Sequence, residues 1–193
     1  KELLNLILET LKRFIIAEPE VLRAATLWTV FTWFIDVVQI APLAIITSPE
    51  KRCGKTQMSN IMAKLCRCPL QASNITSSAL FRSIEKWRPT LLLDEVDTFL
   101  KDNEDLRGLL NSGHSRDLAY VIRCSGDNHV VTRFNTFGAK LLAGIGALPQ
   151  TIMDRALVLK LRRKKMDEQT ERLRNAPVAM FEELCCKLAR FAE

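Results

Sequence analysis

The fold of this chain is decided by the stretch Ser48-Pro49-Glu50-Lys51-Arg52-Cys53-Gly54-Lys55-Thr56. It follows the apolar run Leu43-Ala44-Ile45-Ile46 and precedes an amphipathic run over residues 58–65. A strand, a loop and a helix that begins at Gly-Lys-Thr form the context of a phosphate-binding loop. Such a loop offers converging backbone N–H groups and the positive end of a helix dipole to a triphosphate. The stretch therefore predicts a nucleotide site.

The individual side chains of this loop have predicted roles. Lys55 is expected to reach the β- and γ-phosphates as a point charge, and Thr56 to place its hydroxyl on Mg²⁺. Gln57, the next residue, completes the predicted cofactor-binding segment, residues 48–57. The pattern G-x-x-x-x-G-K-[ST] wants glycine where Pro49 stands, and proline fixes φ and has no N–H. Taken alone, the loop is equally compatible with an ordinary strand-to-helix turn that carries a solvated lysine.

A second motif, Leu91-Leu92-Leu93-Asp94-Glu95-Val96-Asp97, indicates a buried parallel strand that ends in carboxylates. We expect Asp94 to hold Mg²⁺ through water and Glu95 to orient and polarise the attacking water. The alternative is a strand that merely ends in solvated acids. The distance from the loop suits a βαβ crossover and one more strand, and the two motifs together predict binding of ATP or GTP.

Composition sets broad limits. The chain has 193 residues, 48% hydrophobic and 26% charged, which favours one globular domain, and its net charge of +6 is compatible with nucleic acid without demanding it. The six cysteines form no CxxC pair and the two histidines stand at no zinc spacing, so we expect no structural zinc and reduced thiols in a cytoplasm. Residues 27–46 are apolar, but Asp36, Gln39 and Pro42 interrupt them, which predicts a buried helix and a strand, with no membrane partner.

Periodicity predicts alternating helices and strands, hence an α/β fold with a parallel sheet covered on both faces. Helices are expected over 1–17, 19–38, 55–66, 79–87, 103–110, 149–155 (a short helix or turn), 167–174 and 177–192. Strands are expected over 43–47, 70–75, 90–94, 118–124, 129–134, 140–145 and 156–161. The strands at 118–124 and 129–134 are predicted to form a hairpin around Ser125-Gly126-Asp127-Asn128. This gives N-terminal helices over 1–40, a core over 41–165 and C-terminal helices, a partial lid, over 166–193.

The order of these parts resembles the AAA+ ATPases. Four stretches carry a narrower resemblance: the loop 48–56, Leu93-Asp94-Glu95-Val96-Asp97-Thr98-Phe99, Leu110-Asn111-Ser112-Gly113-His114, and Asp154-Arg155. They are similar to poorly characterised ATPase domains of prophage, plasmid and island proteins, often joined to primase or helicase modules. The resemblance covers roughly residues 40 to 165 and implies a three-layer P-loop NTPase fold, AAA+-like, with ATP and Mg²⁺ as cofactors.

The resemblance also implies assembly. AAA+ proteins act as rings, usually hexamers, in which an arginine finger of one subunit reaches the γ-phosphate held by its neighbour. Arg155 matches that position, with a surface arginine paired to Asp154 as the alternative. Arg116 and Arg123 are weaker candidates for contacts across the interface.

The predicted hairpin resembles the pore-lining insertion of superfamily-three and related replicative helicases. Its expected nucleic-acid residues are Arg123, His129 and Arg133, and its tip holds Asp127 and Asn128, which is not strongly basic. His129 is equally compatible with a plain turn residue. DNA contact at the hairpin therefore remains an expectation from resemblance.

Other features depart from the family or leave alternatives open. The strand over 140–145 ends in Gly144-Ile145-Gly146, where AAA+ proteins usually place a polar residue that holds the attacking water, and too few residues follow Arg163 for a full lid. The basic run around Arg162-Arg163-Lys164-Lys165 suits either phosphates or a solvated strand end. Cys53 lies in the loop, so alkylating it is expected to block nucleotide binding.

The sequence thus predicts an AAA+-type ATPase that couples ATP hydrolysis to movement on DNA in mobile-element replication. Its expected setting is the bacterial cytoplasm, with a primase-type module in the same protein. The alternatives are an ATP-dependent switch, for instance in phage defence, and a protein-remodelling ATPase without DNA motor activity.

Overall fold

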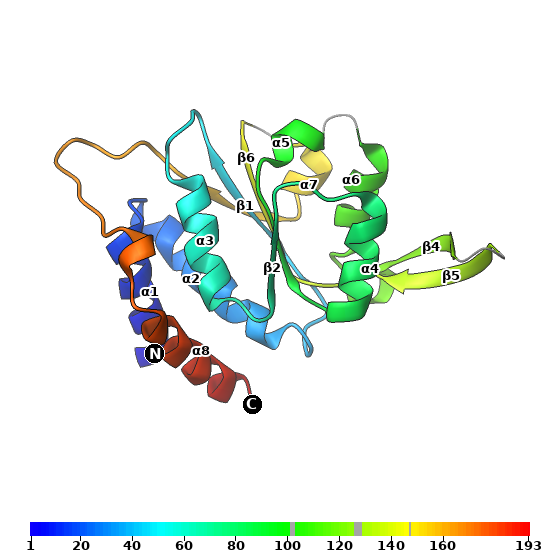
Figure 1. Ribbon diagram of the computed structural model, residues 1–193, viewed down its shortest axis with the longest axis horizontal. Helices are drawn as coiled ribbons and strands as arrows, with labels where there is room; N and C mark the ends of the chain where they lie inside the picture. The colour runs from blue at the N-terminus through cyan, green and yellow to red at the C-terminus, as the bar shows by residue number, and fades with distance from the viewer. Residues whose placement is uncertain (101–102, 126–128, 147) are drawn as a thin grey trace.

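A five-stranded parallel sheet forms the centre of the protein, as seen in a computed structural model that describes residues 1–100, 103–125, 129–146 and 148–193 (Figure 1). The strand order is β2-β3-β6-β1-β7, and every pairing is parallel. These strands are β1 (Leu43–Ser48), β2 (Pro69–Ala72), β3 (Thr90–Leu93), β6 (Lys140–Ile145) and β7 (Ala156–Lys160). The predicted α/β class and parallel sheet are confirmed.

Both faces of the sheet are buried, because alternate side chains of each strand point to opposite faces. Ala44 and Ile46 of β1 join one apolar cluster, whereas Leu43 and Ile45 join another. The first cluster contains side chains of α1 (Glu2–Phe14), α2 (Pro19–Phe31), α3 (Lys55–Leu65) and α8 (Val178–Ala192). The second contains side chains of α4 (Ser77–Trp87), α5 (Val96–Phe99), α6 (Glu104–Ser112) and α7 (Gln150–Met153). The molecule therefore has three layers, with helices on each side of the sheet.

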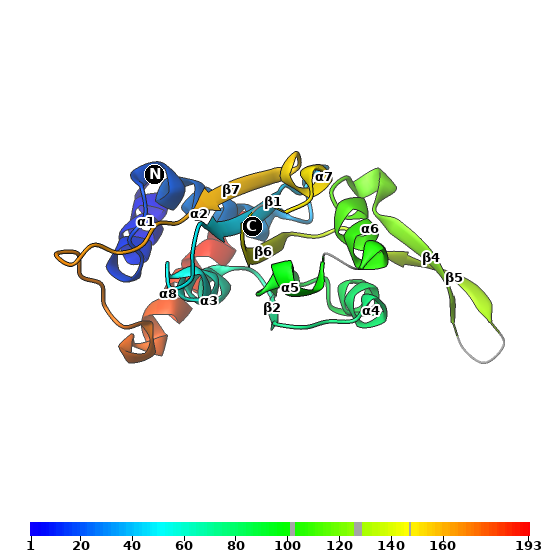
Figure 2. The ribbon, with the colours of Figure 1, turned by 90° about the horizontal axis from the view of Figure 1, so that it is seen from above.

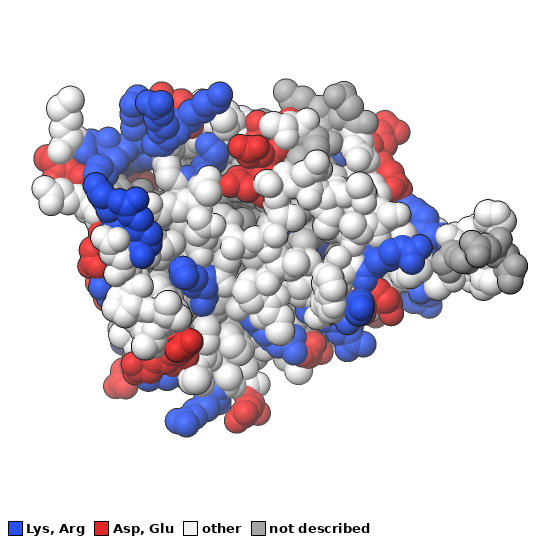
Figure 3. Space-filling model, in the orientation of Figure 1, with Lys and Arg blue, Asp and Glu red and all other residues white. Residues whose placement is uncertain are grey.

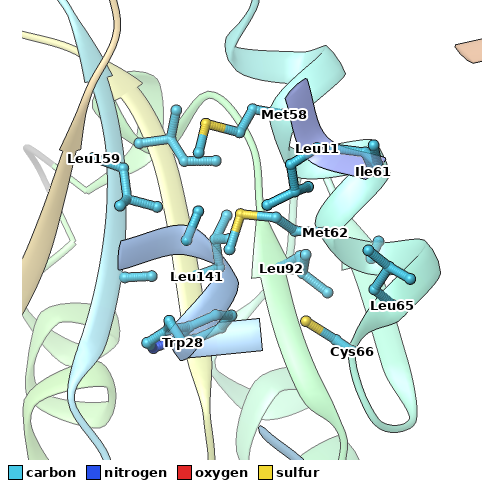
Figure 4. Close-up of a cluster of buried hydrophobic side chains, with 14 of the residues drawn as sticks. Leu11, Trp28, Met58, Ile61, Met62, Leu65, Cys66, Leu92, Leu141 and Leu159 are labelled. Carbon is cyan, nitrogen blue, oxygen red and sulfur yellow. The ribbon is translucent and has the colours of Figure 1, made fainter. Parts of the chain in front are cut away.

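The first cluster ties both ends of the chain to helix α3. Figure 4 shows Met62 of α3 between Leu11 of α1 and Leu141 of β6, with Met58 of α3 above them and Trp28 of α2 below. Phe14 of α1 lies 6.3 Å from Phe181 of α8, ring centre to ring centre. Helix α3 is thus fixed from three sides, which fixes the loop from which it starts.

The hairpin is also confirmed. Strands β4 (Tyr120–Ser125) and β5 (Val130–Asn135) pair antiparallel and project away from the body of the protein (Figures 1 and 2). At its base Phe134 packs on Phe81 of α4, with ring centres 4.6 Å apart. Its predicted tip residues Asp127 and Asn128 lie outside the described residues.

Residues 27–46 form no single helix. They comprise the end of α2, a 3-10 turn (Thr32–Phe34), an irregular link and the first part of β1, so the helix predicted to reach residue 38 ends early. In the described parts of the chain, no helix is both long and apolar enough to cross a membrane.

The helix predicted over 167–174 is wrong. This segment is irregular apart from a 3-10 turn at Leu173–Asn175. Its charged side chains bind elsewhere: Glu168 accepts from Arg162 at 2.6 Å, and Glu171 accepts from Arg13 of α1 at 2.8 Å. These ion pairs hold the irregular segment along the surface.

Candidate functional site

The predicted nucleotide residues meet at the carboxyl edge of the sheet. Strand β6 lies between β1 and β3, so the loops that follow β1 and β3 open on the same edge, on either side of the end of β6. Ligands of open α/β sheets bind at such an edge. Figure 3 shows Lys and Arg side chains gathered over the loop between β1 and α3, beside a group of acidic side chains near α5.

The loop after β1 wraps back onto the start of α3, as predicted. Its left-handed residues are Arg52, with φ 65°, and Gly54, with φ 84°, and Gly54 caps the helix that begins at Lys55. Pro49 lies in the bend that leaves β1 and needs no left-handed conformation there. The departure at Pro49 is therefore compatible with the turn, because the positive φ angles fall later in the loop.

Lys55 and Ser48 close the loop on itself. The Nζ of Lys55 donates to Ser48 Oγ at 2.9 Å, and Ser48 Oγ donates to the carbonyl of Glu50 at 2.6 Å. Ser48 is buried at the end of β1, whereas Lys55 is half-buried. The lysine is thus held over the mouth of the loop, where it can meet an anion.

Thr56 and Asp94 join the two predicted motifs directly. Thr56 Oγ1 donates to Asp94 Oδ2 at 3.0 Å, although the residues lie 38 positions apart in the chain. The other carboxylate oxygen, Asp94 Oδ1, accepts the backbone N–H of Glu95 at 2.9 Å. A hydroxyl and a carboxylate oxygen at hydrogen-bond distance are hard oxygen donors, which Mg²⁺ prefers. The residues present therefore fit a magnesium ion, with other positions left for phosphate and water.

Glu95 follows directly and has a strained backbone. Its φ is 55°, in the left-handed region, and it caps the one-turn helix α5. Thr98 supports this turn: its Oγ1 donates to the Glu95 carbonyl at 2.7 Å and its N–H at 2.9 Å. The Glu95 side chain is exposed, beside the Asp94 carboxylate. Such strain persists where the surroundings hold it and is typical of functional sites.

The inner end of the loop is anchored to the N-terminal helices. Gln57 Nε2 donates to the carbonyl of Phe14 at 2.8 Å. A hollow of about 220 Å³ opens beside it, lined by Ile15, Ile16 and loop residues together with Arg162, Lys164 and Thr170. Cys53 also lines this hollow, but only 6% of it is exposed. That alkylation of Cys53 blocks nucleotide binding stays a prediction, and the burial of the thiol implies that the reaction is slow in the folded chain.

Asp97 of α5 places a polar side chain at the end of β6. Gly144-Ile145-Gly146 has no polar side chain, as noted from the sequence, but Asp97 Oδ1 accepts the Ile145 N–H at 3.0 Å. From the other side, Thr47 Oγ1 donates to the Gly146 carbonyl at 2.8 Å. Sequence reasoning missed Asp97 as a site residue, although it lies three residues after Asp94.

Arg155 lies at the opposite edge of the sheet from the loop between β1 and α3. It precedes Ala156, which pairs with Leu43 at the start of β1, whereas the loop leaves the end of β1 at Ser48. At a rise of about 3.3 Å per residue the two edges lie roughly 17 Å apart. The Arg155 Nη1 donates to the carbonyl of Asn111, at 2.8 Å. Arg155 cannot reach the loop of its own chain, and no ion pair with Asp154 forms among the described residues.

Arg116, a predicted interface candidate, is engaged inside the chain. Its guanidinium donates to the carbonyls of Ile35 and Val38, at 2.6 and 2.9 Å, and lies over the Phe137 ring at 4.3 Å. His114 Nδ1 lies 3.1 Å from the carbonyl of Ala41. The Asn-Ser-Gly-His segment and Arg116 therefore join the residues before β1 to the base of the hairpin, a structural role.

Lys140, which sequence reasoning also missed, lies under this segment. It is buried, with 1% exposed, and its burial lowers the pKa of the ammonium to about 7. Its Nζ donates to three carbonyl oxygens, those of Gly113 at 3.3 Å, Thr136 at 2.8 Å and Gly138 at 3.1 Å. The sequence signal that could have identified Lys140 is a lysine within an otherwise apolar strand pattern.

The predicted nucleic-acid residues of the hairpin do not form one basic patch. Arg123 pairs with Asp105 of α6, and Arg133 stacks on the Tyr120 ring at 3.9 Å. His129 has φ 50° and is exposed, as suits a turn residue. The same hairpin exposes apolar side chains, among them Ile122 and Val131.

The two arginines of the basic run after β7 form ion pairs. Arg162 binds both Glu168 and Glu18, at 2.6 and 3.0 Å, and this guanidinium lowers the pKa of Glu168 to about 2. Arg163 Nη1 lies 3.9 Å from Glu50 Oε2 in the loop between β1 and α3. Part of the run therefore ties the C-terminal segment to the N-terminal helices and to the loop.

The chain matches no model of a known protein family, and it matches none of the curated proteins with which it was compared.

Proposed function

We propose that this protein binds ATP with Mg²⁺ and hydrolyses it, as a P-loop ATPase of the AAA+ type. One observation carries the proposal: the hydrogen bond of 3.0 Å between Thr56 Oγ1 and Asp94 Oδ2. It brings a lysine-bearing helix start and a carboxylate-ended strand to one place, which is the division of labour that phosphoryl transfer needs. Either motif alone has an ordinary structural explanation, but this contact between them does not follow from either one.

Each side chain has a role in that proposal. Lys55 exchanges Ser48 for the phosphates, and the backbone N–H groups of residues 52–56 add donors around them. Thr56 and Asp94 would hold Mg²⁺, and the ion would supply positive charge that stabilises the phosphates. Glu95, exposed beside them, orients the attacking water and accepts its proton as the bond to the leaving diphosphate breaks. The hollow of about 220 Å³ next to the loop offers Ile15 and Ile16 to a base.

The position of Arg155 supports a role for this residue at the site of a neighbouring subunit. Its position at the far edge of the sheet excludes a role at the site of its own chain, whereas a neighbouring copy could receive it at its own phosphate loop. Such a contact adds positive charge where negative charge develops in the transition state. We therefore include a ring oligomer, hexameric by resemblance, in the proposal.

The proposed work of this ATPase is movement on DNA, in line with the net charge of +6 and the projecting hairpin. A second candidate is a switch or remodeller that acts on a protein. The hairpin favours this second function, because Arg123 is held by Asp105 while Ile122 and Val131 are exposed. Apolar side chains suit a protein surface better than a phosphate backbone.

The test is ATP turnover with and without single-stranded and double-stranded DNA, for the wild type, Lys55→Ala and Glu95→Gln. Lys64→Ala, an exposed lysine further along α3, is the matched control and is expected to behave as the wild type. Loss of turnover in both site variants, with stimulation by DNA, supports the motor. Turnover that ignores DNA favours the protein-directed function, and a wild type that binds no nucleotide overturns the proposal.

A further inference from the structure

Asp97 connects the turn that carries Glu95 to the end of the neighbouring strand β6. Its Oδ1 accepts the backbone N–H of Ile145 at 3.0 Å, and the side chain is half-buried between the two elements. The bond therefore lies beside the acidic pair, between the turn that follows β3 and the end of β6.

Gly144 leaves the space in which this carboxylate lies. A β-carbon on Gly144 would stand 2.9 Å from Asp97 Oδ1 and 3.1 Å from Val96 Cγ2. Gly144 has no positive φ, so space alone explains a glycine there. β6 and α5 can therefore approach closely because Gly144 has no side chain and Asp97 on the facing turn supplies a hydrogen-bond acceptor.

The orientation of Glu95 depends on α5. Its N–H is bound by Asp94 Oδ1 and its carbonyl by Thr98, so the residue must follow if the turn moves. A single helical turn has little stability of its own, because nucleation is costly. It needs anchors, and α5 has two on its inner side: buried Val96 and the bond from Asp97 to Ile145.

We propose that Asp97 is a positioning residue for Glu95, and that its hydrogen bond to Ile145 holds the strained Glu95 backbone in the geometry that hydrolysis needs. The inference rests on the proposed ATPase function. The role is geometric: an acceptor at Oδ1 is required, whereas a negative charge is not. Asp97 acts on water through Glu95 and makes no contact with the phosphates.

The experiment compares Asp97→Ala with Asp97→Asn, which keeps an acceptor oxygen. It measures kcat and KM for ATP, the affinity for a fluorescent ATP analogue with Mg²⁺, and urea unfolding. We expect Asp97→Ala to lower kcat by about tenfold or more, with KM and analogue affinity within about threefold of the wild type. Asp97→Asn is expected to restore kcat to within about threefold. The control is Asp117→Ala, an exposed acid beside the residues that precede β1, which should change nothing.

Gly144→Ala tests the same contact from the other strand. Its methyl group should push Asp97 away and lower kcat, while the double variant Gly144→Ala/Asp97→Ala should be no worse than Asp97→Ala alone. Such non-additivity is expected of two residues that share one contact. Independent, additive losses would overturn the inference.

The outcomes separate the inference from the function on which it rests. A wild type that neither binds nor hydrolyses ATP overturns the proposed function, and the inference with it. A wild type that hydrolyses ATP, with Asp97→Ala equally active, overturns the inference alone. The inference is also overturned if Asp97→Asn is as impaired as Asp97→Ala. It is overturned as well if kcat, analogue affinity and the free energy of unfolding all fall together, because Asp97 would then have only a structural role.

Discussion

The side-chain nitrogen of Lys140 occupies the space that a β-carbon on Gly113 would need. The same β-carbon would collide with the carbonyl oxygen of Thr136, which also accepts from Lys140. The segment after α6, the start of β6 and the base of the hairpin therefore meet at one closely packed point.

Gly113→Ala is expected to destabilise the protein. The added methyl has no flexible neighbour to displace on the backbone side, and overpacking of this kind costs about 1–3 kcal/mol. Urea unfolding measures the change. Gly108→Ala within α6 is the matched control, because a β-carbon there meets nothing within 4 Å and alanine favours a helix by about 1 kcal/mol over glycine. Equal effects of the two substitutions would contradict the packing described here.

Lys140 also predicts a pH dependence of stability. Burial lowers the pKa of Lys140 from 10.5 to about 7, so above pH 7 the unfolded chain binds this proton more tightly than the folded one. The free energy of unfolding should therefore rise with pH, by up to about 1 kcal/mol per unit, between about pH 7 and 8.5. The window stops there because burial raises the pKa of Cys66 to about 12, which opposes the trend above its ordinary value of 9.0.

The comparison is with Lys140→Met, which removes the titrating group. This variant should lose the rise, and it should be less stable than the wild type, because three carbonyl oxygens lose their donor. A rise of the same slope in both proteins would assign the dependence to other groups.

Substitutions of Thr56 should show that its hydroxyl, and not its methyl group, is needed for Mg²⁺-dependent ATP binding. Thr56→Ser keeps the donor to Asp94 and should retain Mg²⁺-dependent ATP binding, whereas Thr56→Ala should weaken it by about tenfold or more. Titration of ATP with and without Mg²⁺ measures this. If Thr56→Ala bound Mg²⁺-ATP as tightly as the wild type, the hydroxyl would hold no metal.

Arg155 predicts complementation between subunits. Lys55→Ala removes the site of its own chain, and Arg155→Ala removes the group offered to a neighbour, so each variant alone should be inactive. Mixed oligomers should recover part of the turnover, since some interfaces combine an intact loop with an intact Arg155. Activity of Arg155→Ala alone at the wild-type level would leave Arg155 only its hydrogen bond to Asn111.

The cysteines predict an order of alkylation. Cys68, Cys124 and Cys186 are exposed, whereas Cys53 and Cys66 are buried. In the native protein an alkylating reagent should modify the exposed set first, without loss of ATP binding, and reach Cys53 only as the chain unfolds. Peptide mass spectrometry after short exposure checks this, and early labelling of Cys53 would show that the loop opens.

Sequence patterns were sufficient where one local signal determined the outcome. Helix α4, predicted over 79–87, begins at Ser77, where the Thr76 side chain accepts the Ala79 N–H at 3.2 Å, and strand β6 has the predicted bounds of residues 140–145. Parallel strands buried on both faces leave continuous apolar runs, and such runs are easily recognised.

Contacts between distant residues were not predictable in the same way. No periodicity indicates that Asp97 binds the Ile145 N–H, or that Arg116 binds the Val38 carbonyl. Nor does any pattern indicate that Glu168 pairs with Arg162 and Glu171 with Arg13. These pairings depend on which elements become neighbours in the sheet and its layers. The four-residue helix α5 was missed because its sequence overlaps the acidic motif and is too short for a periodic signal.

The principal polar groups of the site bind one another: Lys55 contacts Ser48, and Thr56 contacts Asp94. Ordering a long side chain at a binding surface costs about 0.5–1.5 kcal/mol. Here these contacts restrict the rotamers in the folded chain, so under the proposed function a phosphate and its metal would exchange partners within an ordered site. The selectivity of the site among anions then depends on how well each anion replaces these internal hydrogen bonds. A small monoanion that replaces only one of them should compete poorly with a nucleotide.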